Sequence, residues 1–424
     1  MKKHEEVLKK VLEKIKPSKR DLEEITSRTE EFLKKVKERI KKEKIDAEIF
    51  VGGSFAKKTV IKKGKYDVDI FIRYGKKHEY EDFSILTLRL LRDFKEVSRV
   101  HGSRDYFKIE QTPILFIEVI PVKKIKKASE ADNITDLSYS HVHYIHKKIK
   151  SDKTLDEIRI AKAFCYATNC YGAESYIKGF SGYGLELLIY HYKNFFNFAK
   201  AMVKANEKII IDIEKDYKDK KQILLDLNSS KLSSPIILID PTYRQRNVLA
   251  ALSQETFEKF KKECKKFIEN PNISLFEEKK QNMEKIKKKA QNNNKNFVCI
   301  EITTSKQAGD VAGSKLLKFF NHIKEEVEKN FEITEEEFSY EGEKTSKVFL
   351  CVKPKKREIL KGPLMKDELN AKAFKKKHKK AFEKNKNLWV EEDYEQDLKK
   401  FIEKWIHKNK DKIQDMSIED ISYI

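Results

Sequence analysis

The sequence predicts a multidomain α+β protein, and three observations carry this prediction. The chain has 424 residues, more than one ordinary hydrophobic core accommodates. Short strand-like runs stand among helix-like segments in its first third, and a second set of such runs follows a long helical stretch. We therefore expect a first domain at 1–150, a helical domain at 151–272, and an α+β domain with a basic helical end at 273–424.

The first region opens with a predicted helix over 18–43. Apolar residues recur there at helical spacing, and Ser18 and Asp21 are residue types that start helices. The period then changes to that of β-structure, and the apolar runs place three strands at 47–51, 66–73 and 114–120. Three short strands among helices indicate a small α/β or α+β domain.

The later regions are predicted to be mainly helical up to about residue 270. Apolar faces at helical spacing place helices at 155–168, 184–206 and 253–268. Pro235 and Pro241 interrupt this pattern between the second and third of them. Further on we expect a polar linker or exposed helix end at 275–296, strands at 297–302 and 348–353 around a helix at 312–329, and a basic helical segment at 366–410.

The charge balance is strongly basic. Lys and Arg number 91 against 69 Asp and Glu, a formal net charge of +22. A field of this sign favours a polyanionic partner, although a proteome rich in lysine would give the same composition, and composition alone leaves the two explanations even. The lysine run at 375–380 is accordingly either a contact for a nucleic-acid backbone or a solvated helix face.

Several classes of protein are disfavoured by the sequence. Five cysteines without a CxxC pair predict no zinc site and fit a reducing compartment. The N-terminal residues lack the apolar segment of a signal peptide, and no apolar run is long enough to span a bilayer. We expect a cytoplasmic protein without membrane contact.

Three acidic residues carry the chemistry that the sequence indicates. Asp67 and Asp69 alternate within a predicted strand, so both side chains point to the same face. Neighbouring carboxylates repel each other unless a cation lies between them, and oxygen ligands suit Mg²⁺. Glu118 interrupts the apolar run at 114–120, where an unpaired acid is costly. If the two strands are neighbours, Glu118 completes a three-carboxylate metal site.

A glycine-rich turn precedes these acids. Gly52, Gly53 and Ser54 follow a predicted strand, and glycines allow backbone N–H groups to approach a phosphate. Such a turn alone, or two alternating acids alone, is a weak signal. Their combination with a later acid inside a strand is more specific and favours metal-assisted phosphoryl transfer over coincidence.

This ordered pattern resembles the polymerase-beta-like nucleotidyltransferases. Within them, the chain resembles the archaeal-type (class I) CCA-adding enzymes, or CCA tRNA nucleotidyltransferases, in segments that run in order over nearly its whole length. These segments are YGAE and GFSGY within 162–189, DPTYRQRNVLAALS at 240–253, LKGP at 360–363 and LWVEE at 388–392. The resemblance implies a nucleotidyltransferase palm domain, a helical neck, an α+β body and a helical tail.

The resemblance also implies an activity and its partners. The RNA 3′-hydroxyl would attack the α-phosphate of CTP or ATP at a two-metal Mg²⁺ site, releasing pyrophosphate and adding CCA to tRNA without a template. The partner would be tRNA at its acceptor end and 3′ terminus, and relatives of this kind form homodimers. Whether one chain adds all three nucleotides stays open.

The family's functional residues fall on matching positions of this chain. The resemblance implies that Asp67, Asp69 and Glu118 are the metal-binding, catalytic carboxylates. The positions implied to bind the incoming nucleotide are Gly53, Ser54, Lys57, His141, Lys162, Tyr171 and Arg246. Asp136 matches a further acid of the family. Four positions depart from the frequent residues: Asp67, Glu118, Lys57 and Leu137 stand where Glu, Asp, Arg and Arg are common.

Two rival interpretations remain at this level. Another polymerase-beta-like enzyme, such as a poly(A) polymerase, would share the three acids but not the ordered segments. A non-enzymatic RNA-binding relative would keep the charge and the fold, and intact Asp67 and Asp69 argue against it.

Overall fold

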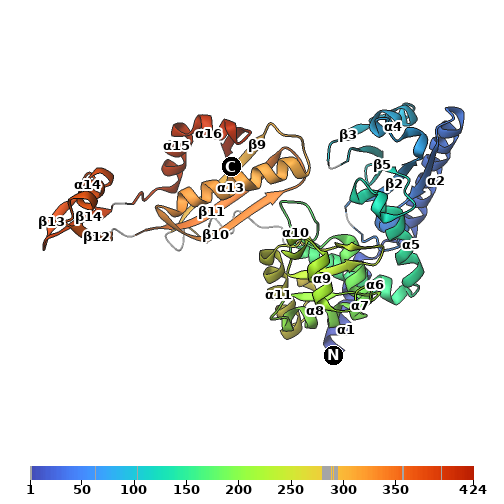
Figure 1. Ribbon diagram of the computed structural model, residues 1–424, viewed down its shortest axis with the longest axis horizontal. Helices are drawn as coiled ribbons and strands as arrows, with labels where there is room; N and C mark the ends of the chain where they lie inside the picture. Colours follow the sequence, from blue (N-terminus) through green and yellow to red (C-terminus); the bar gives the residue numbers. More distant parts are fainter. Residues whose placement is uncertain are drawn as a thin grey trace. The chain divides into compact units, whose positions relative to one another are not determined.

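The computed structural model describes residues 2–62, 64–102, 104–278, 288, 290, 295–355, 358–392 and 394–424. The chain separates into two compact units, Met1–Lys279 and Lys280–Ile424, which are described in turn (Figure 1). The helices of the first unit are α1 (Lys2–Ile15), α2 (Lys19–Lys42), α3 (Gly53–Ala56), α4 (Phe83–Leu91), α5 (Ser138–Lys148), α6 (Asp152–Ala167), α7 (Gly182–Tyr192), α8 (Phe195–Lys204), α9 (Lys220–Asp226), α10 (Ser229–Leu232) and α11 (Gln254–Glu269). Its strands are β1 (Ala47–Val51), β2 (Tyr66–Tyr74), β3 (Ser98–Val100), β4 (Tyr106–Thr112), β5 (Leu115–Lys123), β6 (Ile209–Ile211), β7 (Ile236–Asp240) and β8 (Tyr243–Asn247).

A five-stranded sheet organises the first part of this unit, in the order β1-β2-β5-β4-β3. Its central strands β2 and β5 run parallel, and the remaining pairs are antiparallel. One face packs against α2 and α4 to form a core that includes Phe32, Val36, Ile70, Leu90 and Ile117. The three predicted strands are confirmed. The sequence analysis missed β3 and β4, which are shorter or less regular in their alternation.

The predicted helix at 18–43 is confirmed as α2, and its start has the expected cause. Ser18 is the N-cap: its hydroxyl accepts the backbone N–H of Asp21, and the Asp21 carboxylate accepts the backbone N–H of Ser18. This reciprocal pair satisfies two helix-terminal donors that would otherwise lack partners.

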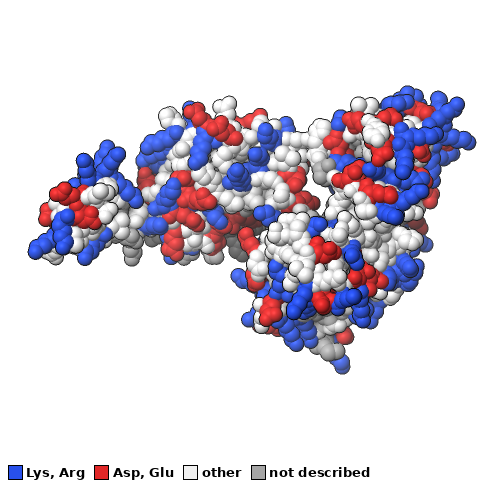
Figure 2. All heavy atoms as spheres, in the orientation of Figure 1, with Lys and Arg blue, Asp and Glu red and all other residues white. Residues whose placement is uncertain are grey.

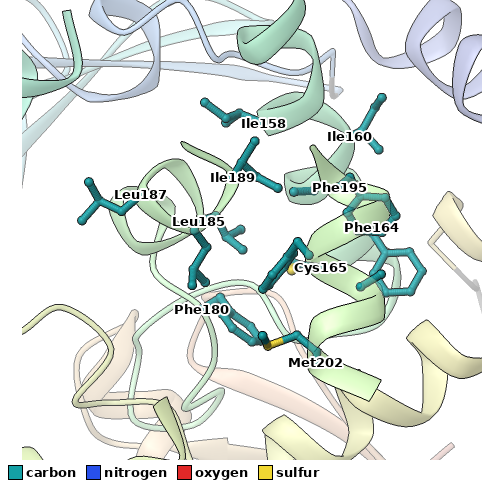
Figure 3. Packing of buried hydrophobic residues seen from close by; sticks show 14 of the residues in the cluster. Ile158, Ile160, Phe164, Cys165, Phe180, Leu185, Leu187, Ile189, Phe195 and Met202 are labelled. Carbon is teal, nitrogen blue, oxygen red and sulfur yellow. The ribbon is translucent and has the colours of Figure 1, made fainter. Parts of the chain in front are cut away.

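A largely helical second core completes the first unit. Helices α1, α6, α7, α8 and α11 surround a cluster rich in aromatic side chains, among them Phe164, Phe180 and Phe195 (Figure 3). The single helix predicted at 184–206 is wrong. The chain instead ends α7 at Tyr192 and restarts α8 at Phe195, because Lys193 takes a φ of 76° and the Asn194 side chain caps the next helix.

A small sheet of order β6-β7-β8 joins this helical core. Pro235 directly precedes β7 and Pro241 directly follows it, so the predicted break of the helical pattern is confirmed. Pro241 and Thr242 form the tight connection to β8, whose Asn247 pairs with Ile239.

The second unit is an α+β unit, as predicted. Its helices are α13 (Asp310–Glu328), α14 (Glu368–Lys377), α15 (Leu398–Lys408) and α16 (Lys410–Asp415). Its strands are β9 (Asn296–Thr304), β10 (Phe331–Tyr340), β11 (Thr345–Pro354), β12 (Glu358–Leu364), β13 (Phe382–Lys384), β14 (Asn387–Glu392) and β15 (Ile418–Tyr423). Four antiparallel strands in the order β10-β11-β9-β15 form its main sheet, with α13 and α15 in the shared core. This strand–helix–strand–strand–helix–strand order is that of the ferredoxin-like motif.

The predicted helical tail at 366–410 is wrong over its middle part. The segment contains α14 and α15, but a β-hairpin of β13 and β14 stands between them and pairs with β12. Asn385 and Lys386 both have positive φ, 52° and 62°, which makes a two-residue turn matched to the twist of a hairpin. This turn, and not the basic composition, decides the local structure.

Three further expectations concern the linker, the cysteines and membrane-spanning helices. The linker expected at 275–296 lies mostly outside the described residues. All five cysteines are buried, and each is a thiol that takes part in no disulfide. None of the helices in the described part of the chain is long and apolar enough to cross a bilayer.

Candidate active site

Asp67, Asp69 and Glu118 lie on one face of the five-stranded sheet. Asp69 on β2 is directly opposite Glu118 on β5 in the parallel register, and Asp67 is opposite Phe116. Every second residue along a strand lies on the same face, so all three carboxylates lie on the face of the sheet that is turned away from the packed core. Asp67 is exposed, and Asp69 and Glu118 are partly buried.

Burial and neighbouring negative charge disfavour the ionised forms of Asp69 and Glu118. Burial and the negative charge of Asp67 raise the pKa of Asp69 to about 6, against the opposing effect of nearby lysines. Burial and the charges of Asp69 and Asp67 raise the pKa of Glu118 to about 7. As they stand, no three His, Cys, Asp or Glu side chains among the described residues converge to hold a metal ion. The site is thus a face of mutually repelling carboxylates, which a cation would stabilise.

The glycine turn packs directly onto this face. The backbone N–H of Gly52 donates to the carbonyl oxygen of Asp69 at 2.8 Å. Gly53 has a φ of +59°, and a Cβ atom there would lie 1.6 Å from Asp69 Oδ2. Ser54 follows within the short helix α3. A glycine is therefore required at position 53 both by the backbone conformation and by the contact with Asp69.

Lys57 and Lys162 meet in a buried cluster around Glu186. Lys57 Nζ donates to Glu186 Oε2 at 2.7 Å, and Lys162 Nζ donates to Glu186 Oε1 at 3.0 Å. The Thr59 hydroxyl joins them, donating to Glu186 Oε1 and accepting from Lys162 Nζ. Burial alone would raise the pKa of Glu186, yet the two ammonium groups hold it below its ordinary value. Glu186 is therefore an ionised carboxylate inside the protein.

A second buried carboxylate, Asp240, joins His141 to Arg246. Its Oδ2 atom accepts from Arg246 Nη1 at 2.7 Å and lies 3.1 Å from His141 Nε2. Its Oδ1 atom accepts from the Tyr183 hydroxyl and from Thr242. Although burial favours the neutral acid, the contacts with His141 and Arg246 hold the pKa of Asp240 well below its usual range. The His141 ring also stacks on Tyr183, with centroids 4.1 Å apart.

Tyr171 lies beside the lysine cluster. Its ring stacks on Tyr166 at 4.0 Å between centroids, and burial raises its pKa well above the ordinary value. A Cβ atom at Gly182 would lie 2.7 Å from the Tyr171 hydroxyl and 4.0 Å from Lys162 Cε. Gly182, the second glycine of GFSGY, therefore allows α7 to begin close to both side chains.

These groups form one connected region within the first unit. Lys57 Nζ lies 5.8 Å from the centroid of the Tyr183 ring, which joins the lysine cluster to the Asp240 group. The charges of Lys57 and Lys162 act on Asp69, which joins the cluster to the carboxylate face. The structure thus brings together residues from β2, β5, α3, α5, α6, α7 and β8.

Two of the buried acids were missed by the sequence analysis. Glu186 is a single acid in the apolar run YGLELLIY, and Asp240 ends the apolar run IILID. A lone acid in an apolar element is costly unless it is paired, so both carried the same signal that identified Glu118.

By contrast, Asp136 is a structural acid. It accepts the backbone N–H groups of Lys123, Asp132 and Asn133 and pairs with Arg104.

Two parts of the chain match nucleotidyltransferase families. Residues 30–162 match the family described as "Nucleotidyltransferase domain", and residues 156–277 match "tRNA nucleotidyltransferase, second domain". The two matches overlap at residues 156–162. They cover the carboxylate face, helices α6 and α7 with Lys162 and Glu186, and strand β8 with Arg246.

Similar proteins extend this assignment. The CCA-adding enzyme of Nanoarchaeum equitans is 40% identical over 211 residues, which is 50% of this chain and 52% of that protein. The CCA-adding enzyme of Methanocaldococcus jannaschii is 29% identical over 293 residues, 66% of this chain and 63% of that protein. The chain thus spans between half and two thirds of the length of these curated relatives.

Solved structures agree in fold alone. A Cid1 poly(U) polymerase is 13% identical with a TM-score of 0.50, over 64% of this chain and 98% of that one. A cytoplasmic RNA terminal U-transferase is 14% identical with a TM-score of 0.50, over 66% of this chain and all of that one. The chain thus carries matches to a nucleotidyltransferase domain and to the second domain of tRNA nucleotidyltransferases, and its sequence is similar to archaeal CCA-adding enzymes over half to two thirds of their length.

Proposed function

We propose that this protein adds CCA to the 3′ end of tRNA from CTP and ATP, without a template and with release of pyrophosphate. The observation that carries the proposal is the packing of the Gly52–Ser54 turn on Asp69, which faces Glu118 across the sheet. A phosphate-binding turn against a carboxylate face joins the two halves of a nucleotidyl-transfer site. Two of the residues implied to bind the nucleotide, Lys57 and Lys162, lie close enough to this face for their charges to act on Asp69.

The carboxylates have the chemistry of a Mg²⁺ site, although their side chains do not converge on one point as they stand. They offer only oxygen donors and lie on one face, and the charge of Asp67 helps to raise the pKa values of Asp69 and Glu118, so a divalent cation would offset their repulsion. We propose that Asp67, Asp69 and Glu118 would hold two Mg²⁺ ions, which would supply activation of the attacking hydroxyl and neutralisation of charge on the phosphates. In this proposal Gly53, Ser54 and Lys57 bind the triphosphate.

The other side chains would orient the nucleotide. Lys162 and Tyr171 lie next to the Lys57 cluster, and we propose that they hold the nucleotide with it. His141 and Arg246 are fixed by one carboxylate, Asp240, so they would present a rigid pair of polar groups. Most of the catalytic effect would then come from positioning and from charge neutralisation.

The partner in this proposal is tRNA, bound at its acceptor end. The net charge of +22 supplies an attractive field, and Figure 2 shows Lys and Arg side chains over α2 and over the α14 segment, with acids between them. Three exposed lysines, Lys375, Lys376 and Lys377, end α14 and would contact phosphates. We further propose that the palm domain spans 1–150, the neck 151–272 and the body with its tail 273–424. The proposal also includes a homodimer and a cytoplasmic location.

The test is an incorporation assay on three tRNA transcripts, ending before CCA, after C and after CC. Each is incubated with Mg²⁺ and CTP, ATP, UTP or CTP plus ATP. Asp69→Ala removes a proposed metal ligand, and Glu23→Ala, an exposed acid of α2, is the matched control. We expect ordered completion of CCA by the wild type and by Glu23→Ala, and none by Asp69→Ala.

Other outcomes would redirect the assignment. Long A tails would indicate a poly(A) polymerase, and addition of A alone would indicate an enzyme that performs only the last step. Tight tRNA binding without incorporation of any nucleotide would contradict the enzymatic proposal and favour an RNA-binding relative.

A further inference from the structure

We propose that Glu186 is a positioning residue that holds Lys57 and Lys162 ready for the triphosphate of the incoming nucleotide. This inference rests on the proposed function, since it assigns a role toward the nucleotide of that reaction. Glu186 would not touch the nucleotide and would act only through the two lysines.

Glu186 binds one lysine through each of its two carboxylate oxygens, and we call this group of Glu186, Lys57 and Lys162 the anchor. Glu186 lies on α7 and has no solvent exposure. One carboxylate oxygen accepts from Lys57 at 2.7 Å, and the other accepts from Lys162 at 3.0 Å. Each ammonium group is thus held by a different oxygen of one buried carboxylate. Lysine side chains lose several rotatable bonds of freedom in such an arrangement, which is a cost already met before a nucleotide arrives.

The anchor joins three segments that are distant in sequence. Lys57 follows the glycine turn, Lys162 lies on α6, and Glu186 lies on α7. Arg159 of α6 strengthens the same junction by donating to the carbonyl oxygens of Lys58 and Val60. The chain directly after the glycine turn is therefore held by α6 and α7, and the turn itself lies against Asp69.

The charges explain why an acid is needed here. Two ammonium groups with only 8% and 3% exposure would repel each other and favour loss of a proton without a counter-charge. Glu186 removes this conflict and leaves the trio with one net positive charge. Both lysines lie close enough to Asp69 for their charges to lower its pKa.

The direction in which triphosphate affinity changes distinguishes a positioning role of Glu186 from a simple effect of its charge. Removing a negative charge near a triphosphate would tighten binding if only the overall field mattered. Removing an anchor would weaken binding, because the lysines would move apart or lose a proton. We therefore compare the wild type with Glu186→Gln, which keeps the size of the side chain. Glu157→Gln is the matched control: Glu157 is a partly buried acid of α6 that accepts the backbone N–H of Phe195.

Calorimetric titration with Mg-CTP and with inorganic triphosphate gives the binding readout, and filter binding gives tRNA affinity. We expect Glu186→Gln to weaken binding of both phosphate ligands by about tenfold or more, with tRNA affinity unchanged within about twofold. In turnover we expect a raised KM for CTP and a reduced kcat. Glu186→Asp should recover part of the loss, and Glu157→Gln should behave as the wild type.

A cycle with Lys57→Met and Lys162→Met tests whether Glu186 acts through these lysines. In the double-lysine variant, Glu186→Gln should have no further effect on triphosphate affinity. If Glu186→Gln proves too unstable, Thr59→Val gives a second route. It removes the hydroxyl that joins Lys162 to Glu186, and it should weaken triphosphate binding in the same direction.

Unchanged or tighter binding in Glu186→Gln, or a loss that persists without the lysines, would overturn the inference while leaving the proposed function standing. A wild-type protein that binds neither Mg-CTP nor triphosphate would instead overturn the proposed site and this inference with it.

Discussion

Gly53→Ala should be a damaging substitution although it adds only one carbon atom. The residue has a φ of +59°, and the added Cβ would lie 1.6 Å from Asp69 Oδ2, where ordinary contacts begin at 3.4 Å. The left-handed backbone alone costs a non-glycine residue about 1–2 kcal/mol. Moving Asp69 away from its preferred rotamer adds roughly 1 kcal/mol, so we expect a loss of about 2–3 kcal/mol in the free energy of unfolding.

Activity should suffer more than stability. Relief of the clash requires a shift of nearly 2 Å in either the turn or the Asp69 carboxylate. A displacement of about 1 Å at a reacting centre is enough to cost roughly 100-fold in rate, so we expect nucleotide incorporation to fall by at least about that factor. Urea unfolding followed by circular dichroism gives the stability change, and single-turnover incorporation gives the rate.

Three control variants separate the causes. Gly64→Ala meets no atom within 4 Å and should be nearly neutral. Gly342→Ala has a φ of +92° in open space and should show the backbone cost alone. In an Asp69→Ala background, Gly53→Ala should lose most of the contribution that comes from the clash. Activity of Gly53→Ala within about threefold of the wild type would refute the contact between the turn and Asp69 as a requirement.

Three further predictions follow from the charged groups. Because the fold raises the pKa values of Asp69 and Glu118 to about 6 and 7, their protonation favours folding at low pH, and this contribution is lost as pH rises through those values. Mg²⁺ should therefore raise the Tm more at about pH 7.5 than at about pH 5.5, and equal shifts in thermal melts would contradict this. Asp240→Asn should cost roughly 3–5 kcal/mol in urea unfolding and raise the KM for both nucleotides, since it leaves the Arg246 charge without its buried partner; a neutral result would remove Asp240 from the site. Changing Lys375–Lys377 to alanine should reduce the salt dependence of tRNA binding by about two to three units of slope without affecting Mg-CTP affinity, and an unchanged slope would make this run a solvated helix face.

Local patterns were enough for much of the fold because they reflect local physics. The Ser18 start of α2 and the strand that carries Asp67 and Asp69 depend on capping and on alternation, which neighbouring residues determine. The secondary-structure predictions were wrong where the backbone angle of a single residue outweighs the average helix propensity of its segment. Lys193 divides one predicted helix into two, and Asn385 with Lys386 turns a basic segment into a hairpin. Positive φ at a non-glycine residue leaves little trace in composition.

The sequence by itself determined the residue types and their order: a glycine turn, two alternating acids, a later acid in a strand, and the ordered segments that resemble the CCA-adding enzymes. Those features lie within single elements, where the spacing of residues fixes the face on which they lie. Only the tertiary structure decided which of these elements meet. The pairing of β2 with β5 brings Asp69 opposite Glu118, and the packing of α6 and α7 beside the glycine turn brings Lys57 and Lys162 to Glu186. Such contacts join residues that belong to different elements, up to 129 positions apart for Lys57 and Glu186. They depend on how separate apolar faces bury each other, which no local pattern specifies.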